Sequence, residues 1–145
     1  MRRSEIPMKT LIVGSRTIVD PKRVEAGIIC LQKLLKEDIT HIISGGARGV
    51  DTLAEEYAKK NNIKFTKYPA DWNKHGKKAG YLRNEEMVKE ADYALVIWDG
   101  KSKGTKNSID LIETKGIPCV MYRMEADAVM VETTGFGIEW IKDYV

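Results

Sequence analysis

The sequence predicts an α/β fold: a single Rossmann-like domain, residues 1–145, with a mainly parallel sheet of about five strands and helices on both faces. Short apolar runs alternate with segments in which apolar residues recur at helical spacing, the pattern of a parallel sheet covered by helices. The length of 145 residues suits one domain with a substantial core. Loops rich in glycine and charge follow the predicted strands at their carboxyl ends, where open α/β sheets bind ligands.

The first half of the chain contains two strands and two helices. The first strand is expected at 9–14, and the helix after its loop begins with Asp20 and Pro21. Aspartate is a good capping residue, and proline lacks an N–H that the first helical turn would leave unpaired in any case. A second strand is expected at 39–44, followed by a glycine-rich turn and a helix that ends near Asn61.

The second half of the chain alternates in the same way. Its predicted elements are a third strand at 63–68, a basic loop at 73–78, a helix at 80–90, a strand at 93–98, a helix at 105–115 and a fifth strand at 118–122. The third strand is polar, which is typical of a sheet edge, whereas the apolar fourth is typical of a strand buried on both faces. After this core of about 9–122, residues 123–145 form an extension or an interface, in which 128–132 can be a strand and 138–144 a terminal helix or strand.

Composition limits the class of protein. Hydrophobic residues make up 43% and charged residues 31%, which excludes a disordered chain and a membrane protein. The sequence shows no membrane span and no signal-peptide hydrophobic region, so a cytoplasmic protein is expected. Cys30 and Cys119 lie in apolar stretches and are expected to be core thiols; the spacing offers no metal site, and no cofactor is expected. The net charge of +3 is small for a partner such as duplex DNA.

The glycine-rich turn Ser44-Gly45-Gly46-Ala47-Arg48-Gly49-Val50-Asp51 is the strongest candidate for a binding site. Glycines let the backbone approach a ligand closely, and the N–H groups at the start of the following helix attract anions. The alternative is a tight connection between strand and helix. Further polar or glycine-containing loops at 14–16, 71–72 and 100–105 are expected at the same edge of the sheet, which favours phosphate binding.

Fourteen residues are candidates for ligand binding. They are Gly14, Ser15, Arg16, Ser44, Gly45, Gly46, Arg48, Gly49, Asp51, Trp72, Arg83, Asn84, Gly104 and Thr105. Arg83 borders the inward stripe of its helix, where an arginine is costly unless it meets an anion. Arg48 either binds phosphate or is a solvated loop residue. Asp51 either meets ribose hydroxyls or is a first-turn acid favoured by the helix dipole, and Trp72 either stacks on a base or caps the core.

Six motifs occur in order between residues 9 and 122. They are Gly14-Ser15-Arg16, Ser44 to Asp51, Ala70-Asp71-Trp72, Ala79-Gly80, Arg83 to Met87 and Gly104-Thr105. Together they resemble the YspA-like branch of the SLOG superfamily, which joins the Lonely Guy phosphoribohydrolases, the Smf/DprA DNA-processing proteins and nucleotide-sensing domains of bacterial defence systems. The resemblance implies a Rossmann-like domain whose glycine turns hold a nucleotide or a nucleotide-derived phosphate, in a homodimer or higher homo-oligomer.

The resemblance also tests for catalysis. Arg83 matches the arginine that Lonely Guy enzymes use beside the glycosidic bond, and Gly104-Thr105 matches their second phosphate-binding turn. Those enzymes carry a catalytic glutamate three residues after the threonine, where this chain has Ser108. Cleavage of a glycosidic bond needs a carboxylate to stabilise oxocarbenium character or to relay protons. A substitute would have to come from Asp71, Asp99, Asp110 or Glu86.

Three functions remain. The leading hypothesis is a module that binds a nucleotide or a nucleotide-derived phosphate at the carboxyl edge of the sheet, as a sensor or a sequestering protein. The first alternative is an N-glycosidic hydrolase of nucleotides with a displaced carboxylate, in which Arg83 and Asp71 would be catalytic. The second alternative, a single-stranded DNA-processing protein, would need a basic and aromatic groove. The small net charge argues against nucleic acid, so a small nucleotide-derived molecule is the expected ligand.

Overall fold

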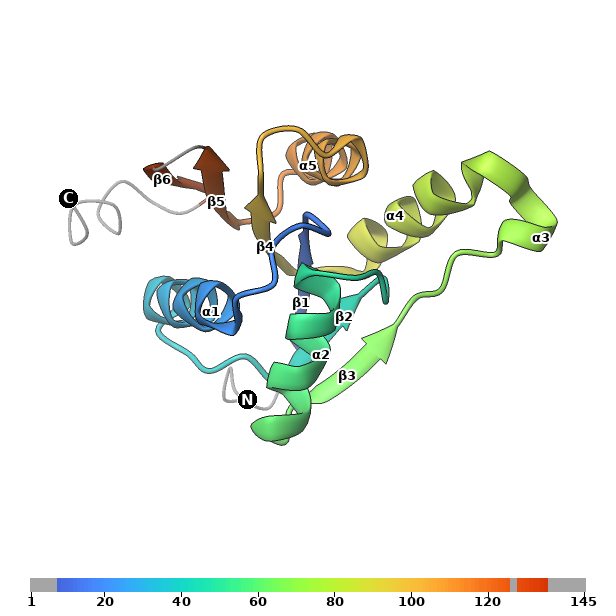
Figure 1. Cartoon of the computed structure of the whole chain (residues 1–145). Helices are drawn as coiled ribbons and strands as arrows, with labels where there is room; N and C mark the ends of the chain where they lie inside the picture. Colours follow the sequence, from blue (N-terminus) through green and yellow to red (C-terminus); the bar gives the residue numbers. More distant parts are fainter. Residues whose placement is uncertain (1–7, 126–127, 136–145) are drawn as a thin grey trace.

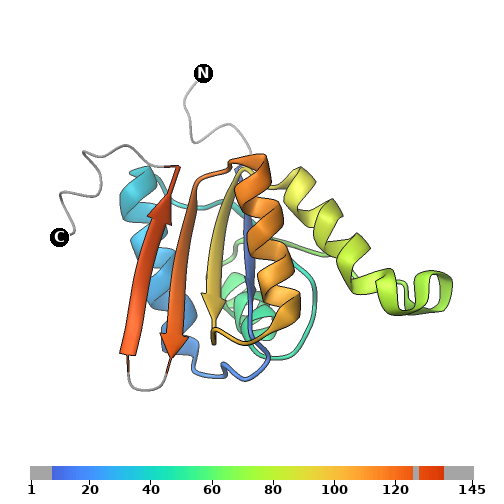
Figure 2. The ribbon, with the colours of Figure 1, turned by 90° about the horizontal axis from the view of Figure 1, so that it is seen from above.

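Five parallel strands and one antiparallel strand form a single sheet, in the order β3-β2-β1-β4-β5-β6 (Figures 1 and 2). The structure, a computed structural model, describes residues 8–125 and 128–135. The strands are β1 (Lys9–Gly14), β2 (His41–Ser44), β3 (Lys64–Lys67), β4 (Tyr93–Trp98), β5 (Cys119–Glu125) and β6 (Ala128–Thr134). The helices are α1 (Pro21–Leu35), α2 (Val50–Lys60), α3 (Trp72–His75), α4 (Ala79–Glu90) and α5 (Lys103–Lys115), and a 3₁₀ turn at Gly76–Lys78 lies between α3 and α4.

Helices cover both faces of the sheet, as the sequence predicts. In Figure 1, α1 and α2 lie below the sheet and α4 and α5 above it. Successive residues of β1 point to opposite faces: Ile12 packs in the core under α1 and α2, whereas Leu11 and Val13 pack in the core under α4 and α5. β4 is buried at every position, which confirms that it is covered on both sides.

Local sequence signals explain where α1 begins and ends. The side chain of Asp20 accepts a hydrogen bond from the backbone N–H of Lys22 (3.0 Å), and Pro21 is the first helical residue. The helix ends where Lys36 adopts a left-handed conformation (φ 56°), which lets its N–H reach the last carbonyls. The predicted start of this helix is therefore confirmed.

The structure differs from the prediction in two places. The sheet has six strands rather than about five, because the possible strand at 128–132 is present as β6, which pairs antiparallel with β5 over residues 128–134. Residues 73–78 are not a loop: they lie in α3 and the 3₁₀ turn, and Asp71 caps α3 by accepting a hydrogen bond from the Lys74 N–H (3.1 Å). A helix of one turn with no buried residue has no apolar periodicity to detect. The segment predicted as a terminal helix or strand, 138–144, lies outside the described residues.

One part of the molecule projects from the rest. α3, the 3₁₀ turn and the first turn of α4, residues 72–82, form an arm that extends away from the sheet beyond the edge strand β3 (Figures 1 and 2). β3 is the first strand in the sheet order, which confirms the prediction that the third strand is an edge strand.

Among the helices in residues 8–125 and 128–135, none has the length and apolar character that a membrane span requires.

Candidate anion-binding site

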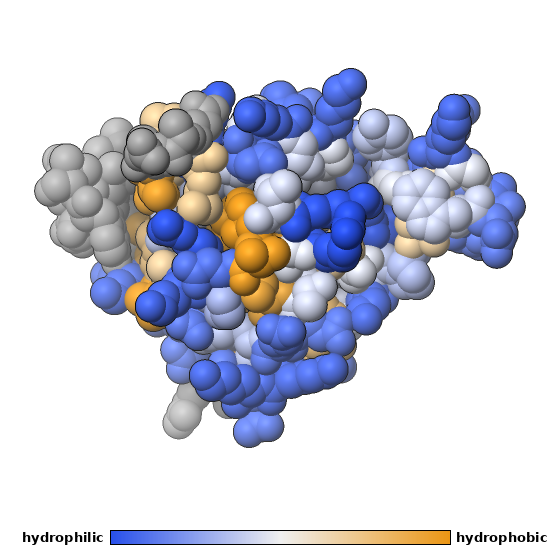
Figure 3. Space-filling view, in the orientation of Figure 1, coloured by the Kyte–Doolittle hydropathy of each residue, from blue (hydrophilic) through white to orange (hydrophobic). Residues whose placement is uncertain are grey.

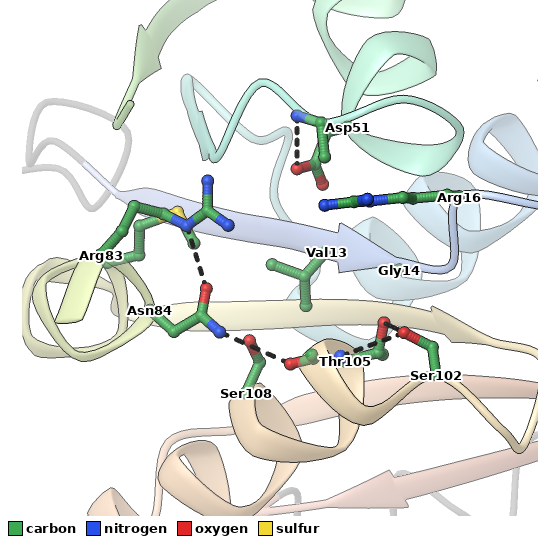
Figure 4. Close-up of a pocket in the computed structure, with 12 residues that line it drawn as sticks. Val13, Gly14, Arg16, Asp51, Arg83, Asn84, Ser102, Thr105 and Ser108 are labelled. Atoms are coloured by element: carbon green, nitrogen blue, oxygen red, sulfur yellow. Dashed lines mark hydrogen bonds between the residues drawn. The ribbon is translucent and has the colours of Figure 1, made fainter. Parts of the chain in front are cut away.

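A pocket of about 80 Å³ lies at the carboxyl edge of the sheet, where the end of β1 meets α2, α4 and α5 (Figure 4). It is lined by Val13, Gly14, Arg16, Ala47, Asp51, Arg83, Asn84, Met87, Ser102, Gly104, Thr105 and Ser108. These residues come from four segments that are far apart in the sequence. Figure 3 shows strongly hydrophilic surface near the centre of this view of the molecule, beside a band of apolar side chains.

Two glycines bring the segments together. Gly49 caps α2 with φ of 74°, and a Cβ there would collide with the carbonyl oxygen of Ser15. A Cβ on Gly14 would collide with the carbonyl oxygen of Ile97 and with the side chain of Val50. The loop after β1 and the start of α2 can therefore touch only because both positions lack a side chain.

Arg83 reaches from α4 across to the glycine-rich turn. Its Nη1 donates to the carbonyl oxygen of Gly45 (2.8 Å), and its Nε donates to Oδ1 of Asn84 (3.1 Å). Asn84 is held in turn, because its Nδ2 donates to Oδ1 of Asn107 (3.0 Å). Arg83 has five N–H donors, so this arrangement fixes the guanidinium and still leaves donors for a ligand.

The charges of the pocket act on one another. Burial lowers the pKa of Arg83; the carboxylate of Asp51 opposes this shift, and the positive charge of Arg16 adds to it. Figure 4 shows the side chains of Arg16 and Arg83 extending toward each other beneath Asp51. Arg16 is exposed and Arg83 is partly buried, so the pocket opens to solvent beside Arg16.

Asp51 is a buried carboxyl in an otherwise basic pocket. Its side chain is turned back to the glycine-rich turn, where Oδ2 accepts a hydrogen bond from the Ala47 N–H (3.0 Å). Burial raises the pKa of Asp51, although hydrogen bonds from Ala47 and Ser44 and the charge of Arg83 partly oppose the shift. The carboxyl therefore helps to hold the turn and sets a negative group beside the two arginines.

The start of α5 closes the pocket on the opposite side. Ser102 caps this helix by accepting from the backbone N–H of Thr105 (3.4 Å) and from its hydroxyl (3.1 Å). Trp98 fixes the cap, because its indole Nε1 donates to the carbonyl oxygen of Ser102 (3.0 Å). This end of α5 lines the pocket with Ser102, Gly104 and Thr105, and N–H groups in the first turn of a helix have no partner within the helix and attract anions.

The structure brings half of the fourteen candidate residues into the lining. These seven are Gly14, Arg16, Asp51, Arg83, Asn84, Gly104 and Thr105. Others support the site from behind: Ser15 Oγ accepts from the Asp99 N–H (2.9 Å), and Ser44 Oγ donates to the Ile12 carbonyl (2.8 Å). Gly46 has φ of 79°, a conformation that side chains rarely adopt.

Arg48 and Trp72 are two of the seven candidates that lie outside the lining. Arg48 is exposed and does not line the pocket. Trp72 lies on the arm with 55% of its surface exposed, so the alternative that it caps the core is wrong.

The substitute carboxylates do not reach the pocket. Asp71 caps α3, Asp99 accepts from the N–H groups of Lys101 and Ser102, and Asp110 pairs with Lys106. Glu86 is exposed on α4 and is not in the lining. Asp51 is the acidic side chain in the lining, and sequence spacing did not single it out for catalysis. Within the two described ranges, no group of three or more His, Cys, Asp or Glu side chains is arranged to hold a metal ion.

Sequence reasoning also missed part of the lining. Val13, Ala47, Met87 and Ser102 line the pocket but were not among the candidates. Ser102 had a signal, because serine is a preferred cap and α5 begins one residue later rather than at Thr105.

The fold is that of DNA processing protein A. The structure of DNA processing protein A from Streptococcus pneumoniae matches with a TM-score of 0.60 at 19% identity. The match covers 79% of the present chain and 50% of the S. pneumoniae chain. The structure from Helicobacter pylori, which describes a single-stranded DNA binding mode, matches with a TM-score of 0.61 at 22% identity, covering 97% of this chain and 74% of that one. At these identities the likeness shows the fold, and the chain spans half the length of the S. pneumoniae chain.

This likeness corrects one prediction from composition. The expectation that nucleic acid is an unlikely partner is contradicted by this neighbour, because the H. pylori protein of the same fold binds single-stranded DNA. A net charge of +3 sums the whole chain, and it does not report how positive side chains are distributed over the surface.

Sequence comparisons identify the family. The model of the YspA, cpYpsA-related SLOG family matches residues 8–75, which include β1, the glycine-rich turn and α3. The Gene 61 protein of Mycobacterium phage D29 is 39% identical over 87 residues, which cover 56% of this chain and 70% of the phage protein. The chain belongs to the YspA, cpYpsA-related SLOG family.

Proposed function

We propose that the protein binds the phosphate of a nucleotide or nucleotide-derived ligand in this pocket, as a sensor or sequestering module. The observation that carries the proposal is the convergence of Arg16, Arg83 and the first turn of α5 on one small space. Arginine forks and helix N-termini are the two groups that proteins most often use to hold phosphate.

The state of Arg83 supports an anionic ligand. It is partly buried, and among the described residues it has no carboxylate within ion-pair distance. Burial of a cation is costly, and the nearby Asp51 carboxylate offsets that cost only in part, because the pKa of Arg83 stays lowered. An anion in the pocket would add negative charge beside the guanidinium, which the hydrogen bonds to Gly45 and Asn84 hold in place.

The size of the pocket limits which part of a ligand enters. Sites that enclose a whole small molecule measure roughly 300–1,000 Å³, whereas this one measures about 80 Å³. The pocket therefore suits a phosphate group, with the rest of a nucleotide lying outside it on the carboxyl edge of the sheet.

Calorimetry with nucleoside phosphates, ADP-ribose and cyclic nucleotides tests the proposal. Arg83→Ala should weaken binding of the best ligand by roughly 10- to 100-fold, the equivalent of about 1.5–3 kcal/mol for a hydrogen bond to a charged group. Arg48→Ala is the matched control, because Arg48 is exposed and outside the lining, and it should leave affinity unchanged. Equal affinities in wild type and Arg83→Ala, or no binding by wild type, would overturn the proposal.

A second candidate function is binding of single-stranded DNA through the same phosphate site. The observation that favours it is the arm, whose Lys74, Lys77 and Lys78 are all exposed, in a fold shared with a protein that binds single-stranded DNA. Each lost contact with a DNA phosphate should reduce the steepness of the plot of log binding constant against log salt concentration by about 0.7 for a single strand. Replacing the three lysines by alanine should flatten that slope, and an unchanged slope would remove the arm from the interface.

Hydrolysis of an N-glycosidic bond has weaker support. Ser108 lines the pocket at the position where the resembling enzymes carry glutamate, and Asp51 is the acid in the lining. Free base released from the same nucleotide panel, and lost in Asp51→Asn, would establish this activity. A flat time course would limit the site to binding.

A further inference from the structure

We infer that Trp72 is the stacking platform for the nucleobase of a ligand whose phosphate lies in the pocket. The inference rests on the proposed function and adds to it the part of the ligand that lies outside the pocket. It joins two observations, the exposure of Trp72 and the position of its ring beside Gly80, with the helical spacing that puts Gly80 on the pocket side of α4.

Trp72 is held in place but is not buried. It opens α3, whose start is capped by Asp71. The Cη2 atom of its ring lies 3.5 Å from the position that a Cβ on Gly80 would occupy. The side chain is still 55% exposed. An aromatic ring that lies beside Gly80 and is still more than half exposed can take a base at low cost in conformational freedom.

Gly80 connects the tryptophan to the pocket. On a helix, residues three, four and seven positions apart lie on the same side. Arg83, Asn84 and Met87 stand at these positions from Gly80, and all three line the pocket. Three residues along a helix rise by about 4.5 Å. The ring of Trp72 therefore lies beside the turn of α4 that precedes Arg83, on the side of the helix that carries these pocket residues.

The surroundings of Trp72 favour an anionic aromatic ligand over an apolar protein surface. Residues 72–78 contain three exposed lysines, at 74, 77 and 78, and no acidic residue. Figure 3 shows the arm, on the right, as mostly hydrophilic surface. Stacking on an aromatic ring accepts any base, while nearby lysines favour the phosphates.

Ligand pairs that differ only in the base test the inference. AMP and ribose 5-phosphate share a phosphate and a sugar, and only AMP has a base to stack. Trp72→Ala should weaken the binding of AMP about 10- to 100-fold, the range expected for stacking on an aromatic ring. It should leave the affinity for ribose 5-phosphate unchanged. Trp72→Phe should retain most of the AMP affinity. Tyr81→Ala is the matched control, because Tyr81 is also exposed on the arm but one position from Gly80, on another side of α4.

The outcomes separate the inference from the proposed function. If wild type binds both ligands and Trp72→Ala binds AMP as tightly as wild type, the stacking platform is wrong and the phosphate site stands. If Trp72→Ala loses ribose 5-phosphate as well, Trp72 positions α4 rather than holding a base, and the inference is overturned. If wild type binds neither ligand nor any other nucleotide, the proposed function and the inference both fall.

Discussion

The guanidinium of Arg83 donates a hydrogen bond to the carbonyl oxygen of Gly45, with Nη1 and oxygen 2.8 Å apart. This bond joins α4 to the glycine-rich turn that precedes α2, two segments separated by 38 residues. It also explains the glycine at position 45, where a Cβ would lie 2.5 Å from Nη1. The glycine leaves space for the arginine that lines the pocket.

Gly45→Ala should therefore weaken phosphate binding without unfolding the protein. The added methyl group displaces Arg83, and we expect a loss of roughly 10-fold in affinity for a bound nucleotide, about 1.4 kcal/mol. A double-mutant cycle measures the cause. In an Arg83→Ala background the methyl group has room, so Gly45→Ala should have little further effect there. Additive losses would show that the alanine acts on the turn itself.

Asp51 should make stability depend on pH. Its pKa is raised above 3.8 by burial, so the folded protein holds the proton more tightly than the unfolded chain does. Ionisation of Asp51 therefore opposes folding. The free energy of unfolding should fall as the pH rises from about the pKa of Asp51 in the unfolded chain through its higher pKa in the folded protein. Asp51→Asn keeps an acceptor for the Ala47 N–H and removes the titration.

Urea denaturation of wild type and Asp51→Asn from pH 3.5 to pH 8 measures how the Asp51 carboxyl changes stability with pH. The variant should gain stability relative to wild type as pH rises, and the difference should level off above the folded pKa. At neutral pH it should also bind sulfate more tightly, because a negative charge beside Arg16 and Arg83 has been removed. Parallel stability curves for the two proteins would contradict the burial effect.

Lys115 should stabilise the C-terminal end of α4. Its Nζ donates to the carbonyl oxygens of Val88, Lys89 and Ala91, at 2.8, 2.7 and 2.8 Å. The Val88 carbonyl also accepts from the Ala91 N–H (3.2 Å), and a cation at this end of α4 meets the negative end of the helix dipole. Lys115→Met should lower the free energy of unfolding by about 1–2 kcal/mol.

Lys106→Met is the control for Lys115→Met, because both lysines lie on α5. Lys106 pairs with Asp110 in an exposed i,i+4 ion pair, so its loss should leave the free energy of unfolding almost unchanged. Equal effects of the two substitutions in urea denaturation would mean that the three carbonyl bonds add nothing to stability.

Thr10 offers a way to stabilise the protein. It lies on β1 with no exposed surface, and among the described side chains its hydroxyl is a fully buried polar group that lacks a hydrogen-bond partner. Thr10→Val replaces that hydroxyl by a methyl group of similar shape and should raise the free energy of unfolding by about 1 kcal/mol. Thr10→Ser keeps the unpaired hydroxyl and should not stabilise, so a gain in both variants would point to another cause.

The sequence by itself determined the fold class and most of the elements. Apolar periodicity and caps are local properties, so the parallel core and the start of α1 at Pro21 could be predicted from neighbouring residues alone. The antiparallel strand β6 was harder, because its Val129, Met130 and Val131 are all exposed, and an edge strand of this kind has no alternation to read. α3 is too short to carry any periodic signal.

The tertiary structure decided which of the polar residues form one site. Motif spacing could place Arg16, Arg83 and Gly104 on loops and helix starts at the same edge, but only packing shows that all three line one pocket. Packing also separates residues that look alike in sequence: Arg48 is exposed outside the lining, while Asp51, three residues later, is buried inside it. Contacts between α4 and the glycine-rich turn depend on distances across the fold, and the order of residues along the chain does not contain those distances.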